Sequence, residues 1–110
     1  MINRRPQAVS KAWECDIVSV SYQKKEKYGI DDLLQIMQIL RGEGGCPWDR
    51  EQTHESKRGS MPEAAYEVCE ASALNAGDLL KEELGEVLLK VVFHARMAPE
   101  AGQFSFADVV

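Results

Sequence analysis

Acidic side chains recur at helical spacing in the second half of the chain. Glu67 and Glu70 stand one turn apart in one segment, and Glu83 and Glu86 stand one turn apart in the next. If the two segments are antiparallel helices joined by a tight turn, their acidic pairs can face each other. Carboxylate oxygens suit Mg²⁺ or Mn²⁺, and Mg²⁺ commonly keeps waters and binds substrate phosphates. The residues alone leave a second interpretation open, a solvated acidic surface.

The stretch 82–94 is the element that would position this chemistry. At 100° per residue, apolar side chains share one side of a helix and predict a core stripe. The stripe consists of Leu80, Leu84, Val87, Leu88, Val91 and Ala95. Glu83, Lys90 and His94 form a second stripe, with Glu86 at its edge. A carboxylate beside a core face is costly unless a cation or a donor meets it. Lys90 therefore either forms ion pairs along the helix or contacts a substrate phosphate.

Helical patterns account for most of the remaining chain and predict an all-α fold. The predicted helices cover about residues 31–41, 60–75, 78–97 and 105 onwards. Their predicted N-caps are Asp31, Ser60, Asp78 and Ser105. Asp49 with Gln52 has the form of a capping box for a further short helix. Residues 15–22 alternate between apolar and polar side chains, which predicts one strand.

Composition narrows the class of protein. A chain of 110 residues is one domain at most. The net charge of −5, with 18 acidic against 13 basic side chains, argues against nucleic-acid binding. No apolar run approaches the ~20 residues that span a membrane, and no signal peptide is visible. Three cysteines far apart fit a reducing cytosol better than a disulfide framework, so we expect a cytoplasmic protein.

One aromatic and two histidines have alternative interpretations. Trp48, next to Pro47, is either a hydrophobic anchor for a turn or a wall for a planar ligand. His54 and His94 favour structural or solvated roles over catalysis. Neither has a nucleophile and a carboxylate placed to suggest a catalytic triad.

Four segments in this order resemble the MazG nucleoside triphosphate pyrophosphohydrolases. They are GGCPWDREQTHES at 44–56, EAAYEV at 63–68, EELGE at 82–86 and VVFHA at 91–95. The resemblance covers about residues 29–110. The GCPWD segment is similar to the first repeat of the two-repeat bacterial members, or to members that carry a single such domain.

The resemblance implies a fold and a reaction. It implies a MazG-like all-α domain at 30–110 that dimerises into a helical bundle, as a homodimer or a dimer of dimers, behind an N-terminal extension at 1–29. The implied reaction splits nucleoside triphosphates into monophosphates and pyrophosphate, a housecleaning of the nucleotide pool, with a Mg²⁺-activated water attacking the α-phosphorus. The family's metal cluster is carried onto Glu63, Glu67, Glu83 and Glu86, with Glu67 and Glu83 as catalytic residues. Trp48 and Lys90 are the expected substrate contacts.

The chain departs from the family pattern at several positions. Ala64 stands where the family has a second Glu, and Glu86 replaces an Asp. Residues 57–62 replace a stretch that the family keeps helical and apolar, and the final helix is truncated. Each departure weakens the expectation of Mg²⁺ binding. The alternative function is therefore a catalytically weak or inactive MazG-like module for helical dimerisation or regulation.

Overall fold

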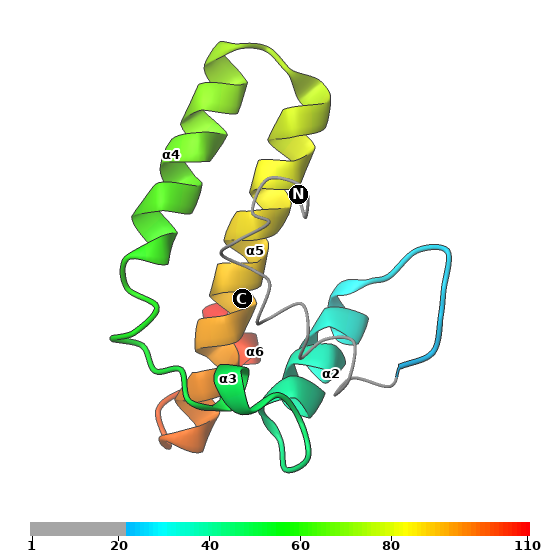
Figure 1. The fold of residues 1–110 in the computed structure, drawn as a ribbon, viewed down its shortest axis with the longest axis vertical. Coiled ribbons are helices and arrows are strands. Elements are labelled where there is room, and N and C mark those ends of the chain that lie inside the picture. Colours follow the sequence, from blue (N-terminus) through cyan, green and yellow to red (C-terminus); the bar gives the residue numbers. More distant parts are fainter. Residues whose placement is uncertain (1–21) are drawn as a thin grey trace. The chain divides into compact units, whose positions relative to one another are not determined.

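The computed structural model describes residues 22–110, and every regular element in that range is a helix (Figure 1). This confirms the all-α prediction. The strand predicted at 15–22 lies almost wholly outside the described residues, and Tyr22 itself has no regular secondary structure. The chain divides into two compact units between Gln52 and Thr53. Each unit is described by itself.

The first unit contains α2, Ile30–Arg41, whose start is organised by a buried carboxylate. Asp32 accepts a hydrogen bond from the Gly29 backbone N–H at 2.8 Å, pairs with the Lys25 ammonium and accepts from the Tyr22 hydroxyl at 2.7 Å. The prediction of Asp31 as the N-cap is wrong, because Gly29 precedes the helix and Asp32 reaches back to it.

A tight turn rich in glycine follows α2. Gly44 has a φ of 81°, a left-handed conformation that favours glycine. Gly45 lies so close to the end of α2 that an added Cβ would fall 2.2 Å from the Ile39 carbonyl oxygen. The Cys46 N–H then donates to the Leu40 carbonyl at 2.8 Å. The turn therefore depends on the missing side chain at Gly45.

Helix α3, Pro47–Arg50, is a single turn that Cys46 precedes. Proline suits the first helical position because its missing N–H would have no helical partner there. The predicted capping box is wrong, because the Gln52 side chain donates to the Trp48 carbonyl instead. Cys46 is fully buried and disulfide-bonded, contrary to the expectation of reduced cysteines.

The second unit is a long helical hairpin followed by a short helix. Its elements are α4 (Ser60–Ala73), α5 (Gly77–Glu100) and α6 (Phe106–Val109). Helices α4 and α5 run antiparallel side by side (Figure 1). Asn75, with a φ of 54°, makes the reversal between them, and Gly77 is the first residue of α5. Ser60 and Asp78 lie inside the helices, so the predictions of these residues as N-caps are wrong. Ser105 is confirmed as the N-cap of α6, where its hydroxyl accepts from the Asp108 N–H at 3.3 Å.

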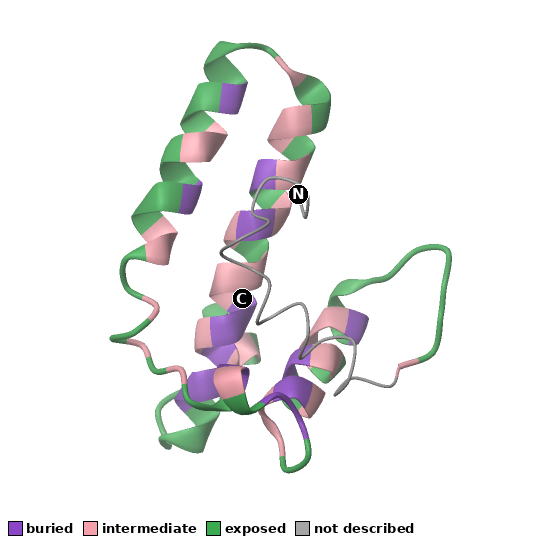
Figure 2. Cartoon of the chain, viewed as in Figure 1, coloured by how far each residue is buried: buried purple, intermediate pink, exposed green. Residues whose placement is uncertain are grey.

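The core of α5 changes along its length (Figure 2). Its C-terminal half buries apolar side chains. These are Val92, Phe93, Ala95, Met97 and Ala98. Its N-terminal half buries Glu83 and Glu86, whereas Leu84 is 51% exposed and Leu88 is 43% exposed. The predicted apolar core stripe is therefore wrong at both leucines. No helix among residues 22–110 is long and apolar enough to cross a membrane.

Candidate functional site

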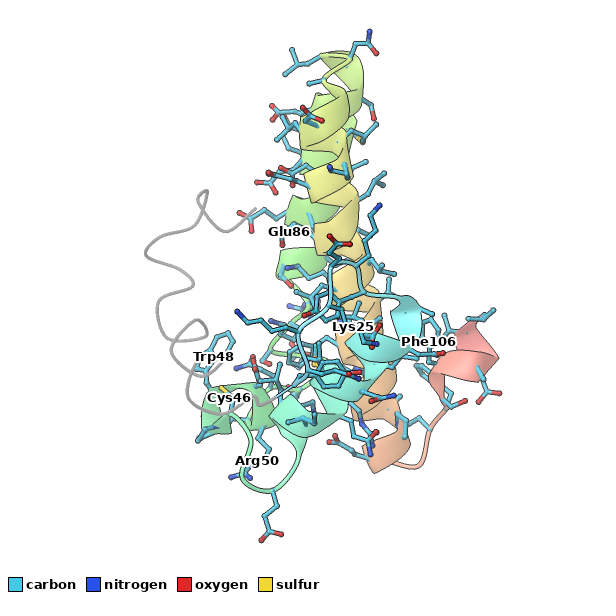
Figure 3. The ribbon with its side chains drawn as sticks, turned by 90° about the vertical axis from the view of Figure 1, so that its right-hand side faces the viewer. Lys25, Cys46, Trp48, Arg50, Glu86 and Phe106 are labelled. Atoms are coloured by element: carbon cyan, nitrogen blue, oxygen red, sulfur yellow. The ribbon has the colours of Figure 1, made fainter. Side chains whose placement is uncertain are left out.

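Two buried carboxylates on α5 form the centre of the candidate site. Glu83 is 1% exposed and Glu86 is 2% exposed, and they stand one helical turn apart. Figure 3 labels Glu86 on its helix. Moving an ionised carboxylate out of water is costly unless charge and hydrogen bonding compensate. The burial of two such groups so close together marks this turn of α5 as a specialised position.

A lysine one turn further along α5 accompanies this pair. The Lys90 ammonium lies 3.5 Å from a Glu86 carboxylate oxygen, and both side chains are largely buried. Of the two interpretations of Lys90, the structure therefore shows an ion pair along the helix. Contact between Lys90 and a substrate phosphate stays a prediction.

Helix α4 presents small side chains on its buried stripe. Ala64 and Ala71 are buried, two turns apart, while Glu67 is half-buried and Glu63 and Glu70 are exposed. In an antiparallel hairpin, residues equally far from the reversal lie at the same level. Counted from Asn75, Glu67 is level with Glu83, and Ala64 is level with Glu86. The one α4 position that is both buried and level with Glu86 therefore carries a methyl group instead of a carboxylate.

The residues fit a divalent cation in kind, but the part of the chain that the structure describes does not complete a cluster. Carboxylate oxygens are the ligands that Mg²⁺ and Mn²⁺ prefer. Among residues 22–110, however, no three His, Cys, Asp or Glu side chains are grouped so that they could hold a metal ion. Of the four predicted ligands, the structure buries the two on α5, leaves Glu67 half-buried and leaves Glu63 exposed. The metal site stays a prediction.

The other predicted substrate contact lies in the first unit. Trp48 is half-buried in α3 (Figure 3), and its backbone carbonyl accepts the hydrogen bond from Gln52. Its role as a wall for a planar ligand stays a prediction.

A histidine pair in the second unit was missed from the sequence. His54 Nδ1 and His94 Nδ1 lie 2.7 Å apart, and the two ring planes are nearly parallel, with an interplanar angle of 8° and centroids 5.0 Å apart. His54 Nε2 also lies 3.0 Å from Gln103 Oε1. The two histidines are 40 residues apart, so no local spacing could have indicated the contact.

Comparison with known proteins places these helices in a family. The MazG nucleotide pyrophosphohydrolase domain matches residues 52–110. The chain is 50% identical over 80 residues to a Thermotoga maritima protein named nucleoside triphosphate pyrophosphohydrolase/pyrophosphatase MazG, and 51% identical over 81 residues to the Escherichia coli nucleoside triphosphate pyrophosphohydrolase. Each match covers 73% of this chain and 31% of the relative. A Mycobacterium tuberculosis protein with the same name as that of E. coli is 45% identical over 68% of this chain and 22% of its own length. The chain thus spans about a third or less of these relatives, and it belongs to the MazG nucleotide pyrophosphohydrolase domain family.

Proposed function

We propose that this domain hydrolyses nucleoside triphosphates to nucleoside monophosphates and pyrophosphate with the help of Mg²⁺ or Mn²⁺. Membership of the MazG family and the names of its relatives support the reaction class. The observation that carries the proposal is the burial of Glu83 and Glu86, one turn apart on α5, the helix that packs against α4. Two buried carboxylates one turn apart repel each other, and a divalent cation would offset this cost beyond what the Lys90 ammonium beside Glu86 supplies.

The carboxylates have distinct roles in this proposal. Glu83 and Glu86 would hold the cation from α5, and Glu67, level with Glu83, would reach it from α4. Glu63, which is exposed, would contribute from the edge of the site. The bound cation would neutralise the triphosphate and favour attack by water at the α-phosphorus. Glu67 and Glu83, as the proposed catalytic pair, would orient that water.

Lys90 and Trp48 would contact the substrate. The position of Lys90 beside Glu86 supports this role, because a cation held by Glu86 would bring a phosphate near the Lys90 ammonium. Trp48 offers a planar surface for stacking of a nucleotide base. We place the protein in the cytoplasm, where nucleoside triphosphates are abundant.

We further propose that the active unit is a homodimer or a dimer of dimers. Leu84 and Leu88, one turn apart on α5, are exposed, and so is Tyr66 on α4. Exposed apolar side chains at helical spacing favour association with another helical surface. A second copy would also bring further carboxylates toward the incomplete ligand set.

The test is direct. Each common nucleoside triphosphate is incubated with the folded protein and Mg²⁺ or Mn²⁺, and pyrophosphate release is measured. The proposal predicts release with at least one nucleotide and its loss in Glu83→Gln. Absence of release with every nucleotide and both metals, by protein shown to be folded, contradicts it.

A second candidate function is favoured by Ala64. This residue is 4% exposed and lies level with Glu86, where the site would gain a further carboxylate. With a methyl group there, the domain would serve as a catalytically weak or inactive helical dimerisation or regulatory module. This candidate predicts a stable dimer whose melting temperature does not respond to Mg²⁺, because a ligand stabilises a fold only by binding it.

A further inference from the structure

Two side chains of the segment between α3 and α4, His54 and Lys57, contact the C-terminal half of α5 and the residues just after it. His54 shares a short hydrogen bond with His94 on α5, and it also bonds to Gln103, just beyond the end of α5. The Gln103 backbone N–H donates to the Ala98 carbonyl at 2.9 Å, so Gln103 is itself held on the helix. A second tie lies beside the first, where the Lys57 ammonium sits 4.7 Å from the centre of the Phe93 ring.

The segment that carries His54 is internally braced up to α4. Thr53 and Ser56 exchange side-chain to backbone hydrogen bonds of 2.8 and 3.0 Å. The Lys57 N–H donates to the Thr53 carbonyl, and both the N–H and the hydroxyl of Ser60 donate to the Lys57 carbonyl. Ser60 is the first residue of α4. A shift of His54 against α5 is therefore transmitted to the start of the helix that carries Glu63 and Glu67.

The pattern of hydrogen bonds fixes where the protons lie. The Gln103 amide oxygen can only accept, so His54 Nε2 must donate to it. A neutral His54 then has an unprotonated Nδ1, and His94 Nδ1 donates to it. When both rings are fully protonated, both Nδ1 atoms carry hydrogens and the bond between them is lost.

We propose that His54, His94 and Gln103 form a proton-sensitive clasp that positions the start of α4 along α5. In this role all three are positioning residues. The clasp is closed at neutral pH and opens as the pH falls below the pKa of an ordinary histidine. Its effect on hydrolysis rests on the proposed function, whereas its effect on the structure of residues 53–60 does not.

The charges around the pair support this direction. Burial, the neighbouring His54 ring and the Lys57 ammonium each lower the pKa of His94 below its ordinary value of 6.5. On the same helix, Lys90 is engaged with Glu86. On α6, the Asp108 carboxylate accepts from Ser105. Because the closed clasp disfavours the charged form of His94, the opened state binds more protons. The stabilisation that the closed clasp contributes is therefore complete above about pH 6.5 and declines as the pH falls from there.

Amide hydrogen exchange tests the clasp without metal or nucleotide. The hydrogen-bonded amides of Ser56, Lys57 and Ser60 should exchange faster at pH 5 than at pH 7.5, by roughly threefold or more after correction for intrinsic rates. The internal control is the amide of Leu74, which is hydrogen-bonded at the far end of the hairpin and should not follow this pattern. His94→Gln, which cannot take a proton, should abolish the pH dependence.

Lys57→Met is a sharper variant because it leaves both histidines in place. Removal of the ammonium lets His94 protonate more readily, so the increase in exchange should begin at a higher pH than in the wild type. The proposal is overturned if the exchange of residues 56–60 does not depend on pH in the wild type. It is also overturned if the pH dependence is the same in His94→Gln. If the variants fold poorly, the imidazole nitrogens of the wild type decide by NMR. At pH 7.5 one Nδ1 should be protonated and the other not, and two unprotonated Nδ1 atoms refute the clasp.

The consequence for activity is measured separately. If the domain hydrolyses nucleotides, its rate should fall below about pH 6.5 more steeply in the wild type than in His94→Gln. If amide exchange depends on pH as expected but no pyrophosphate is released, the proposed function is refuted and the clasp is supported.

Discussion

Ala64→Glu is the substitution that probes the proposed metal site most directly. The methyl group of Ala64 is 4% exposed and lies level with Glu86 across the α4–α5 hairpin. The new carboxylate would enter a packed contact beside a carboxylate that is already buried. Without a cation, overpacking and desolvation should together destabilise the fold by roughly 2–4 kcal/mol. For a domain of this size, 1 kcal/mol moves Tm by about 4–8 °C, so Tm should fall by ~8 °C or more.

A divalent cation should reverse this loss. A ligand at a hundred times its Kd stabilises a fold by about 2.7 kcal/mol, which corresponds to a rise in Tm of at least ~10 °C. The assay is thermal unfolding followed by circular dichroism, in EDTA and in a series of Mg²⁺ or Mn²⁺ concentrations. The wild type should show a smaller rise than Ala64→Glu, because it has one carboxylate fewer.

Ala71→Glu is the matched control. Ala71 is fully buried on the same stripe of α4, but it lies level with Leu79, away from the acidic pair. Its replacement should destabilise the fold to a similar extent without rescue by metal. Equal rescue of the two variants, or no rescue of Ala64→Glu, would refute the reasoning. Pyrophosphate release should rise in Ala64→Glu and stay at the wild-type level or below in Ala71→Glu.

Three further predictions concern other parts of the chain. Gly45→Ala should lower the free energy of unfolding by roughly 1–3 kcal/mol, because its Cβ would overlap the end of α2; urea denaturation should show no such loss for Gly59→Ala, where nothing lies within 4 Å. The Lys25 ammonium, the Gly29 N–H and the Tyr22 hydroxyl lower the pKa of Asp32 from 3.8 to about 2. Stability from Asp32 is thus present above pH 3.8 and lost as the pH falls toward 2, so the unfolding curves of the wild type and Asp32→Asn should converge in that range; persistence of the full difference at pH 2 contradicts this. Leu84→Glu should convert the proposed dimer to a monomer by light scattering, and an unchanged mass argues against α5 as the interface.

Local patterns predicted the helices well and their ends less well. Periodicity placed α2, α4 and α5, and the Ser105 cap of α6 was found because its partner, Asp108, is three residues away. The second helix was predicted to reach residue 75, but α4 ends at Ala73 and Asn75 adopts the left-handed conformation. Several side chains can serve as a cap, so tertiary context decides which of them does.

The burial pattern of α5 was harder to predict. Hydrophobicity assigned Leu84 and Leu88 to the core, yet the structure exposes them and buries Glu83 and Glu86. Apolar periodicity assumes that the core takes the apolar face, and a functional site is where that assumption fails. The proposed dimer would cover Leu84 and Leu88, which would reconcile the apolar periodicity of α5 with the burial pattern of the single chain.

Helical spacing already predicted Glu67, Glu83 and Glu86 as ligands, and the resemblance added Glu63 and the catalytic roles. Only the hairpin shows that Ala64 is level with Glu86. The pairing of His54 with His94 depends on a long-range contact, which spacing in one sequence does not report.

The central claim is that the buried carboxylates of α5 and Glu67 of α4 hold a divalent cation. Titration of ¹⁵N-labelled protein with Mn²⁺ tests it most directly, because the paramagnetic ion broadens the resonances of nearby amides. If these residues hold the cation, broadening should be selective for the surroundings of Glu67, Glu83 and Glu86, should disappear in Glu83→Gln and should be reversed by excess Mg²⁺. Broadening that avoids these residues, or that persists unchanged in Glu83→Gln, would contradict it.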